Sequence, residues 1–103
     1  MKKNKKITRF TKIYCIKVSE RKENGQWVLH DEAYSCANFC REVTHKEYYY
    51  ITCDETVNFF RNLGGTEEIT RDQHHRVLRL VSTSPCKDLR TIYSFEFVDS
   101  KVA

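Results

Sequence analysis

Residues 16–33 read IKVSERKENGQWVLHDEA, and this stretch decides the expected fold. Asn24-Gly25 at its centre is a strong signal for a β-hairpin, because both residues tolerate the positive φ angles of a type I′ turn. With these two residues as the loop, Lys22 faces Trp27, and the pairing continues outward along both strands. The further pairs are Glu20 with Leu29, Val18 with Asp31 and Ile16 with Ala33. Most apolar residues then share one face, which predicts a half-buried antiparallel sheet.

One helix is predicted for about residues 53–63. Thr52 with Glu55 three residues later matches a capping box, in which each side chain satisfies a free backbone N–H. Gly64 occupies the C′ position, where a positive φ angle is needed. Apolar residues at spacings of three and four give the helix a broad apolar face, formed by Cys53, Val57, Phe59, Phe60 and Leu63.

Alternating and β-branched residues predict the remaining elements as strands. These strands are 7–19, 27–34, 47–52, 76–81 and 89–98, with a further short one at 66–71, whereas 35–46 fits either a short helix or a loop. We expect an α+β fold: an antiparallel sheet of four to six strands, with hairpins at both ends and one main helix on its apolar face. Residues 1–6 are expected to be a flexible basic tail, and 7–103 a single globular domain.

Composition excludes several classes of protein. With 40% hydrophobic and 13% aromatic residues among 103, the chain falls outside the disordered class. No apolar run approaches the ~20 residues that span a bilayer. The basic start is followed by further charges at Arg9 and Lys12, where a secretory signal would need an apolar segment. We therefore expect a cytoplasmic protein without a membrane segment.

The net charge of +4 is unevenly distributed. Residues 1–17 contain seven basic and no acidic residues, and removing Lys2, Lys3, Lys5 and Lys6 leaves 14 basic against 14 acidic residues in the whole remainder. The domain after the tail is therefore nearly neutral. A neutral domain gives only a small counterion-release contribution to nucleic-acid binding, so the net charge does not indicate that function.

No catalytic motif is present. No Gly-rich loop precedes a Lys-Ser or Lys-Thr pair, and no short motif joins a Cys to a His, so we expect no enzymatic activity and no cofactor. The five cysteines are an odd number, which does not favour a disulfide framework. A small zinc-binding domain is one alternative, with Cys36, Cys40, His45 and Cys53 as candidate ligands. Because a second closely spaced pair is missing, reduced core cysteines are the favoured interpretation.

A second alternative is a nucleic-acid-binding module. It would use the basic cluster between Arg71 and Arg90 together with the lysine tail. The candidate contact residues for nucleic acid, or equally for a protein partner, are Arg71, His75, Arg76, Arg79, Arg90, Tyr48 and Tyr50. The tyrosines would supply stacking for bases. Arg79 and Arg90 are expected to lie near each other on neighbouring strands.

The second half of the chain carries a resemblance. The segments FFRNLGGTE at 59–67, LVSTSP at 80–85 and FEF at 95–97 resemble small uncharacterised proteins encoded by bacteriophages and mobile elements. This resemblance transfers no activity and no functional residue. It implies a context, in which small accessory proteins bind a host or phage protein, for example as inhibitors of CRISPR nucleases or other defence machinery.

The leading functional hypothesis is therefore a non-catalytic binding protein that acts through a protein–protein interface. It is supported by the lack of catalytic signatures and by the abundance of Tyr, Phe and Arg, which are common at interfaces. A host or phage protein is the expected partner, and an anti-CRISPR-like inhibitor is its most specific form.

Overall fold

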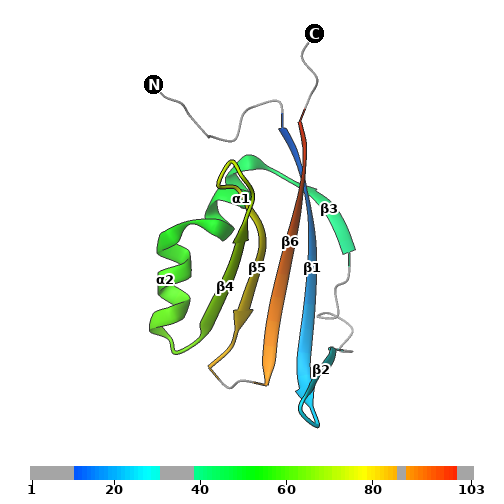
Figure 1. Ribbon diagram of the computed structural model, residues 1–103, viewed down its shortest axis with the longest axis vertical. Helices are drawn as coiled ribbons and strands as arrows, with labels where there is room; N and C mark the ends of the chain where they lie inside the picture. The colour runs from blue at the N-terminus through cyan, green and yellow to red at the C-terminus, as the bar shows by residue number, and fades with distance from the viewer. Residues whose placement is uncertain (1–10, 31–38, 86–87, 100–103) are drawn as a thin grey trace.

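The computed structural model describes residues 11–30, 39–85 and 88–99. In chain order the elements are β1 (Thr11–Glu23), β2 (Gln26–Leu29), β3 (Phe39–Val43), α1 (His45–Thr52), α2 (Asp54–Asn62), β4 (Thr66–Arg71), β5 (Val77–Thr83) and β6 (Leu89–Asp99). Figure 1 shows the sheet with both helices near its β4–β5 side.

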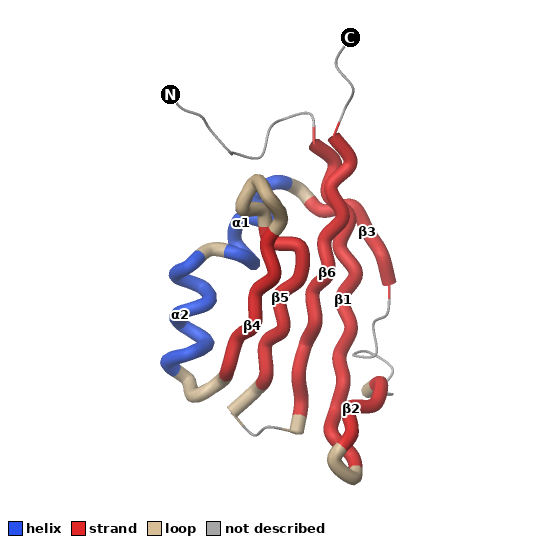
Figure 2. The backbone as a smooth tube through the Cα atoms, viewed as in Figure 1, coloured by secondary structure: helices blue, strands red, loops and turns tan. Residues whose placement is uncertain are grey.

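The strands form one six-stranded sheet in which every pairing is antiparallel. The strand order is β2-β1-β6-β5-β4. Strand β3 also pairs with β1, along the same edge as β2 but at a different part of β1 (Figure 2). Strands β1 and β6 are the longest and pair from Thr11 to Arg21, so they form the middle of the sheet. The predicted α+β architecture, with an antiparallel sheet and hairpins at both ends, is confirmed, although the sheet carries two helices rather than one.

The Asn24-Gly25 hairpin is confirmed. Both loop residues have positive φ angles, 53° and 82°, and Lys22 pairs with Trp27 as predicted. The pairing continues through Glu20 with Leu29 to a 2.9 Å hydrogen bond from the N–H of His30 to the carbonyl of Ser19, beyond which the described residues end. Ile16 pairs instead with Cys40 of β3 on one side and Ser94 of β6 on the other, so the predicted pairing with Ala33 is wrong. Strand β1 extends beyond the end of β2, and β3 pairs with the part of β1 that β2 does not reach. Asp31 and Ala33 themselves lie outside the described residues.

Residues 47–52, predicted as a strand, belong to helix α1. The helix begins with a capping box in which Thr44 and Glu47 each accept a hydrogen bond from the other's backbone N–H. The predicted box at Thr52 and Glu55 is absent, because Thr52 still belongs to α1 and its hydroxyl donates to the carbonyl of Tyr48. Tertiary packing outweighs the strand propensity of the three tyrosines. The helix places Tyr48 in the core and leaves Tyr49 and Tyr50 exposed to solvent.

Helix α2 lies where the sequence predicts it. Its N-cap is Cys53, and it ends with Gly64 at a φ angle of 97°, as predicted. The next residue, Gly65, passes so close to β5 that an added Cβ would lie 2.6 Å from the carbonyl oxygen of Thr83. Only a glycine fits this approach without a shift of the backbone. The end of α2 and the start of β4 are thereby held against the sheet.

The core lies between α1 and the face of the sheet that the helices cover, here called the helix face. Residues opposite each other on paired strands share a face, which places Ile13 with Phe97 and Cys15 with Phe95 on this side. The ring of Tyr48 packs edge-on against Phe95 and Phe97, with centroid distances of 4.9 and 5.1 Å. The buried cluster consists of Ile13, Cys15, Val43, Tyr48, Val77, Leu80 and Phe95.

The hydroxyl of Tyr48 satisfies a break in the sheet. Pairing of β5 with β6 begins only at Arg79, and the register of β5 against β4 shifts by one residue between Thr70 and Arg71. Val77, next to this shift, therefore has no partner on β6. The Tyr48 hydroxyl accepts from its N–H at 2.7 Å and donates to its carbonyl at 3.3 Å. Burial raises the pKa of Tyr48, so the hydroxyl keeps its proton.

Replacing Tyr48 with Phe tests this contact. The variant keeps the ring but leaves the buried N–H and carbonyl of Val77 without a partner, which costs about 1–3 kcal/mol of unfolding free energy. The melting temperature should fall by at least ~4 °C. Urea unfolding followed by circular dichroism measures the free energy, and thermal unfolding followed by the same signal measures the melting temperature. Tyr50→Phe is the matched control and should leave stability unchanged, because that side chain is 70% exposed. Equal stability of Tyr48→Phe and the wild type would contradict the assignment.

Candidate functional site

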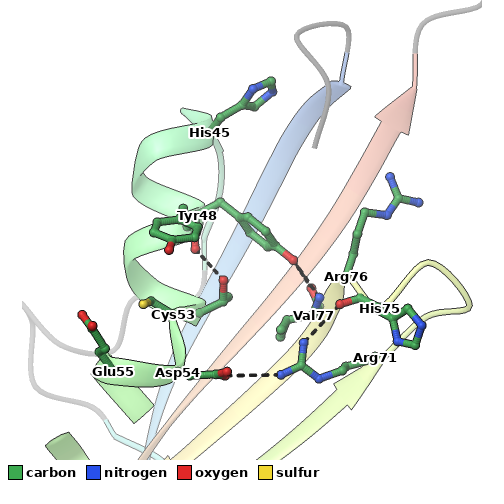
Figure 3. Close-up of a pocket in the computed structure, with 11 residues that line it drawn as sticks. His45, Tyr48, Cys53, Asp54, Glu55, Arg71, His75, Arg76 and Val77 are labelled. Carbon is green, nitrogen blue, oxygen red and sulfur yellow. Dashed lines mark hydrogen bonds and ion pairs between the residues drawn. The ribbon is translucent and has the colours of Figure 1, made fainter. Parts of the chain in front are cut away.

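A pocket of about 730 Å³ lies between the two helices and the β4–β5 turn (Figure 3). Its wall combines α1, the first residues of α2, the end of β4, the β4–β5 turn and the start of β5. The lining residues are His45, Tyr48, Tyr49, Thr52, Cys53, Asp54, Glu55, Arg71, His75, Arg76 and Val77. It thus collects four of the residues that the sequence indicates for binding, Tyr48, Arg71, His75 and Arg76.

Asp72 organises the β4–β5 turn. Its carboxylate accepts from the backbone N–H groups of His74 and Arg76 at 2.8 and 2.9 Å, and from Nε of Arg76 at 2.9 Å. His75 adopts a φ angle of 66°, unusual for a residue with a side chain, and its N–H donates to the carbonyl of Asp72. Although partial burial acts to raise the pKa of Asp72, the hydrogen bonds from Arg76 and His74 lower it overall.

The charges of the arginines in this pocket are compensated. Arg76 forms an ion pair with Asp72, and its guanidinium lies 4.3 Å from the ring centroid of Phe97. Arg71 donates to the carbonyl of His75 at 3.1 Å and lies 3.9 Å from a carboxylate oxygen of Asp54. The dashed lines in Figure 3 mark both contacts of Arg71. These arginines stabilise the turn rather than forming a free cationic surface.

Arg79 and Arg90 do not lie next to each other. Arg79 pairs with Ser94 and Arg90 with Thr83, so four positions of the β5–β6 ladder separate them. The side chain of Arg90 forms a 2.7 Å ion pair with Glu20 and stacks over Trp27 at 4.3 Å. Arg79 is exposed, and no ion pair is found for it among the residues described. The predicted proximity of Arg79 and Arg90 is therefore wrong.

Tyr48 and Tyr50, both proposed as contact residues, have different environments. Tyr48 is only 4% exposed and belongs to the core, so it is unavailable for surface contact. Tyr50 points to solvent from the same helix. The helical period explains the difference: a strand would have placed both on one face, whereas in a helix they lie about 200° apart.

The cysteine and histidine residues do not converge. Within the described part of the chain, no group of three or more His, Cys, Asp or Glu side chains could hold a metal ion. Cys40 is exposed on β3, and Figure 3 shows His45, Cys53 and His75 spread around the pocket. Cys36 lies outside the described residues. Burial raises the pKa of Cys15, which keeps this core thiol protonated.

The structure reveals an exposed surface that the sequence analysis missed. Of the residues assigned to the apolar face of α2, only Val57 is buried, while Phe59 and Leu63 are 59% and 55% exposed. We call the group Tyr50, Phe59, Phe60 and Leu63 the aromatic helix surface. The sequence contains a partial signal: Phe59 and Phe60 are adjacent and point about 100° apart on a helix, so they lie at the two sides of a broad apolar face rather than at its centre.

The aromatic helix surface is continuous. The rings of Phe59 and Phe60 are 5.8 Å apart at their centroids, and Leu63 follows them at helical spacings of four and three. Tyr50 lines a hollow of about 310 Å³ with Phe59, Phe60, Glu55 and Thr56. The hydroxyl of Thr56 donates to the carbonyl of Tyr50 at 2.8 Å, which joins α1 to α2 at this point.

Comparison of the chain with protein-family models, with curated proteins and with solved structures found no match. Within the residues described here, neither helix has the length and hydrophobicity needed to cross a membrane.

The lowered pKa of Asp72 predicts a pH-dependent contribution to stability. The pKa of Asp72 is lower in the folded protein than in the unfolded chain. The ionised carboxylate therefore stabilises the fold fully at pH values above the ordinary Asp pKa of about 4. This stabilisation is lost as the pH falls through the folded pKa. In urea unfolding, Asp72→Asn should be less stable than the wild type at neutral pH, and the difference should shrink at acidic pH.

The matched control for this measurement is Asp54→Asn, because the side chain of Asp54 is 88% exposed and its contact with Arg71 is long. It should change stability little at any pH. A stability difference for Asp72→Asn that is independent of pH would contradict the role assigned to the carboxylate.

Proposed function

We propose that this protein is a non-catalytic binding protein that docks a partner protein through the aromatic helix surface. The observation that supports the proposal is the joint exposure of Tyr50, Phe59, Phe60 and Leu63. Single exposed apolar residues are common on protein surfaces, but a continuous apolar group next to a hollow is typical of an interaction site. Aromatic residues are also enriched among those that dominate binding energy.

The charges beside this surface suggest the chemistry of the partner. Helix α2 begins with Asp54 and Glu55 and carries Arg61 as its basic residue, while Glu67 follows on β4. Of these, Glu55 lines the hollow with Phe59 and Phe60, and Glu67 lines the cavity bordered by Tyr50 and Phe60, so carboxylates lie beside the apolar centre. A partner segment with apolar side chains flanked by Lys or Arg would complement this surface. A second copy of this chain would instead bring acidic groups together, which is unfavourable.

The more specific form of the proposal is an accessory inhibitor of a host defence complex, such as an anti-CRISPR protein. It depends on the resemblance of residues 59–67, 80–85 and 95–97 to phage and mobile-element proteins. The partner would then be a host protein, and binding would occur without a chemical step. The physical basis remains the same surface.

Nucleic-acid binding has less support. Arg76 and Arg90 each form a short ion pair, so a phosphate would have to compete with Asp72 and Glu20 for their guanidinium groups, whereas the contact of Arg71 with Asp54 is long and exposed. Tyr48 is buried and cannot stack on a base. Within the described residues this leaves Arg71 and Arg79 for phosphate contact, which gives only a small counterion-release contribution; the lysine tail of the same alternative lies outside the described residues.

The experiment is a pull-down from a nuclease-treated bacterial host lysate, followed by affinity measurement with the purified partner. Replacing both Phe59 and Leu63 with Ala should weaken partner binding at least about tenfold, the range expected for central interface residues. The matched control replaces Ile16 and Leu29 with Ala. Both are partly exposed and lie on the sheet face opposite the helix face, so this variant should bind like the wild type.

Circular dichroism melting of both variants establishes that they fold. Unchanged affinity of the Phe59 and Leu63 variant would contradict the proposal. Recovery of partners only without nuclease treatment would favour the nucleic-acid alternative, and the steepness of its salt dependence would then measure the phosphate contacts.

A further inference from the structure

A second, smaller cavity of about 210 Å³ lies between the helices and the sheet, next to the aromatic helix surface. The two helices form one wall, and strands β4, β5 and β6 form the other. The lining residues are Tyr50, Ile51, Thr56, Val57, Phe60, Glu67, Leu80, Ser82, Thr91 and Tyr93. Tyr50 and Phe60 belong both to this cavity and to the aromatic helix surface, so a segment docked on that surface passes its entrance.

The two walls differ in chemistry. The helical wall is mainly apolar, with Ile51, Val57 and Phe60. The sheet contributes a polar row, because Glu67 pairs with Ser82 and Ser82 pairs with Thr91, which places these three side chains on one face and in one line. The polar row thus places one carboxylate and two hydroxyl groups opposite the mainly apolar helical wall.

Glu67 is a half-buried carboxylate that forms no short contact with a cationic side chain among the described residues. Its Oε2 accepts from the hydroxyl of Ser82 at 3.1 Å, and it takes part in no ion pair among the described residues. Burial raises the pKa of Glu67, while the Ser82 hydrogen bond and the positive charge of Arg61 only partly offset this effect. A half-buried carboxylate without a counter-ion is costly, and a ligand cation would relieve that cost.

We infer that this cavity binds a primary ammonium group on a short aliphatic chain, as carried by a lysine side chain of the partner segment. The apolar wall suits the methylene stem, and the polar row suits the three donors of the ammonium. The Ser82 hydrogen bond takes one acceptor position of Oε2, so Oε1 is the more available oxygen, and an ammonium needs only one such oxygen, which suits lysine. The inference rests on the proposed function, since it assigns one residue of that partner.

The test uses n-butylammonium as the probe, since it reproduces the lysine side chain. Titration into the full-length protein, followed by backbone amide NMR, should give saturable shifts at Val57, Ser82 and Thr91. Glu67→Gln should weaken binding at least about tenfold, as expected for removal of a charge-assisted contact. Neutral 1-pentanol, of similar shape, should bind the wild type more weakly than n-butylammonium does. Glu67→Ala serves the same purpose if Glu67→Gln does not fold.

Three outcomes would overturn the inference: no saturable shifts with n-butylammonium, equal binding of n-butylammonium and 1-pentanol, or full affinity in both Glu67 variants. The variant with Ala at Phe59 and Leu63 should keep its affinity for the probe, because neither residue lines this cavity. If the proposed docking surface is wrong, the variant with Ala at Phe59 and Leu63 will bind the partner as tightly as the wild type does, and this result is independent of probe binding. Equal partner affinity of Glu67→Gln and the wild type would exclude lysine insertion while leaving the docking surface unaffected.

Discussion

The fold depends on the contact between Tyr48 and the start of β5. One hydroxyl satisfies both backbone groups of Val77 at the point where β5 has no partner on β6, and the same ring packs against Phe95 and Phe97. A buried backbone group without a hydrogen bond is costly, so this single side chain fixes where α1 lies on the sheet. Residues three apart on a regular strand point to opposite faces. The register shift of β5 against β4 allows Val77 and Leu80 both to point into the core beside Tyr48.

The position of α1 determines what remains for α2. The turn at Cys53 is short, and Thr56 joins the two helices through the carbonyl of Tyr50, so α2 follows α1 toward the end of the sheet where β4 begins. Gly65 then holds the next turn against Thr83. Helix α2 contributes only Val57 to the buried interior. Its other large apolar side chains remain at the surface because α2 packs beside the β4 edge, where the sheet offers little area to cover them.

Much of this architecture is predictable from sequence, and the failures have physical causes. Asn24-Gly25 and Gly64 were reliable because each requires a positive φ angle that few other residues adopt. Two Thr-x-x-Glu motifs compete for a capping box, at Thr44 and at Thr52, and local pattern cannot choose between them. Tertiary packing determines which motif forms the box. Burial of Tyr48 favours a helix that begins at Thr44 and runs through Thr52, so Thr52 ends α1 and cannot cap α2.

The candidate sites were less predictable, because charge compensation is a property of the fold. In sequence, Arg71, Arg76 and Arg90 form a basic cluster, yet Glu20 neutralises Arg90 across 70 residues and Asp54 approaches Arg71 from α2. The aromatic helix surface shows the converse effect, since an apolar stripe predicts burial only if another element covers it. Glu67 is similar: adjacent Glu67 and Glu68 look equivalent in sequence, but strand alternation turns one toward the helices and the other away. The residue turned inward is the one that lines the cavity for which the ammonium site is inferred.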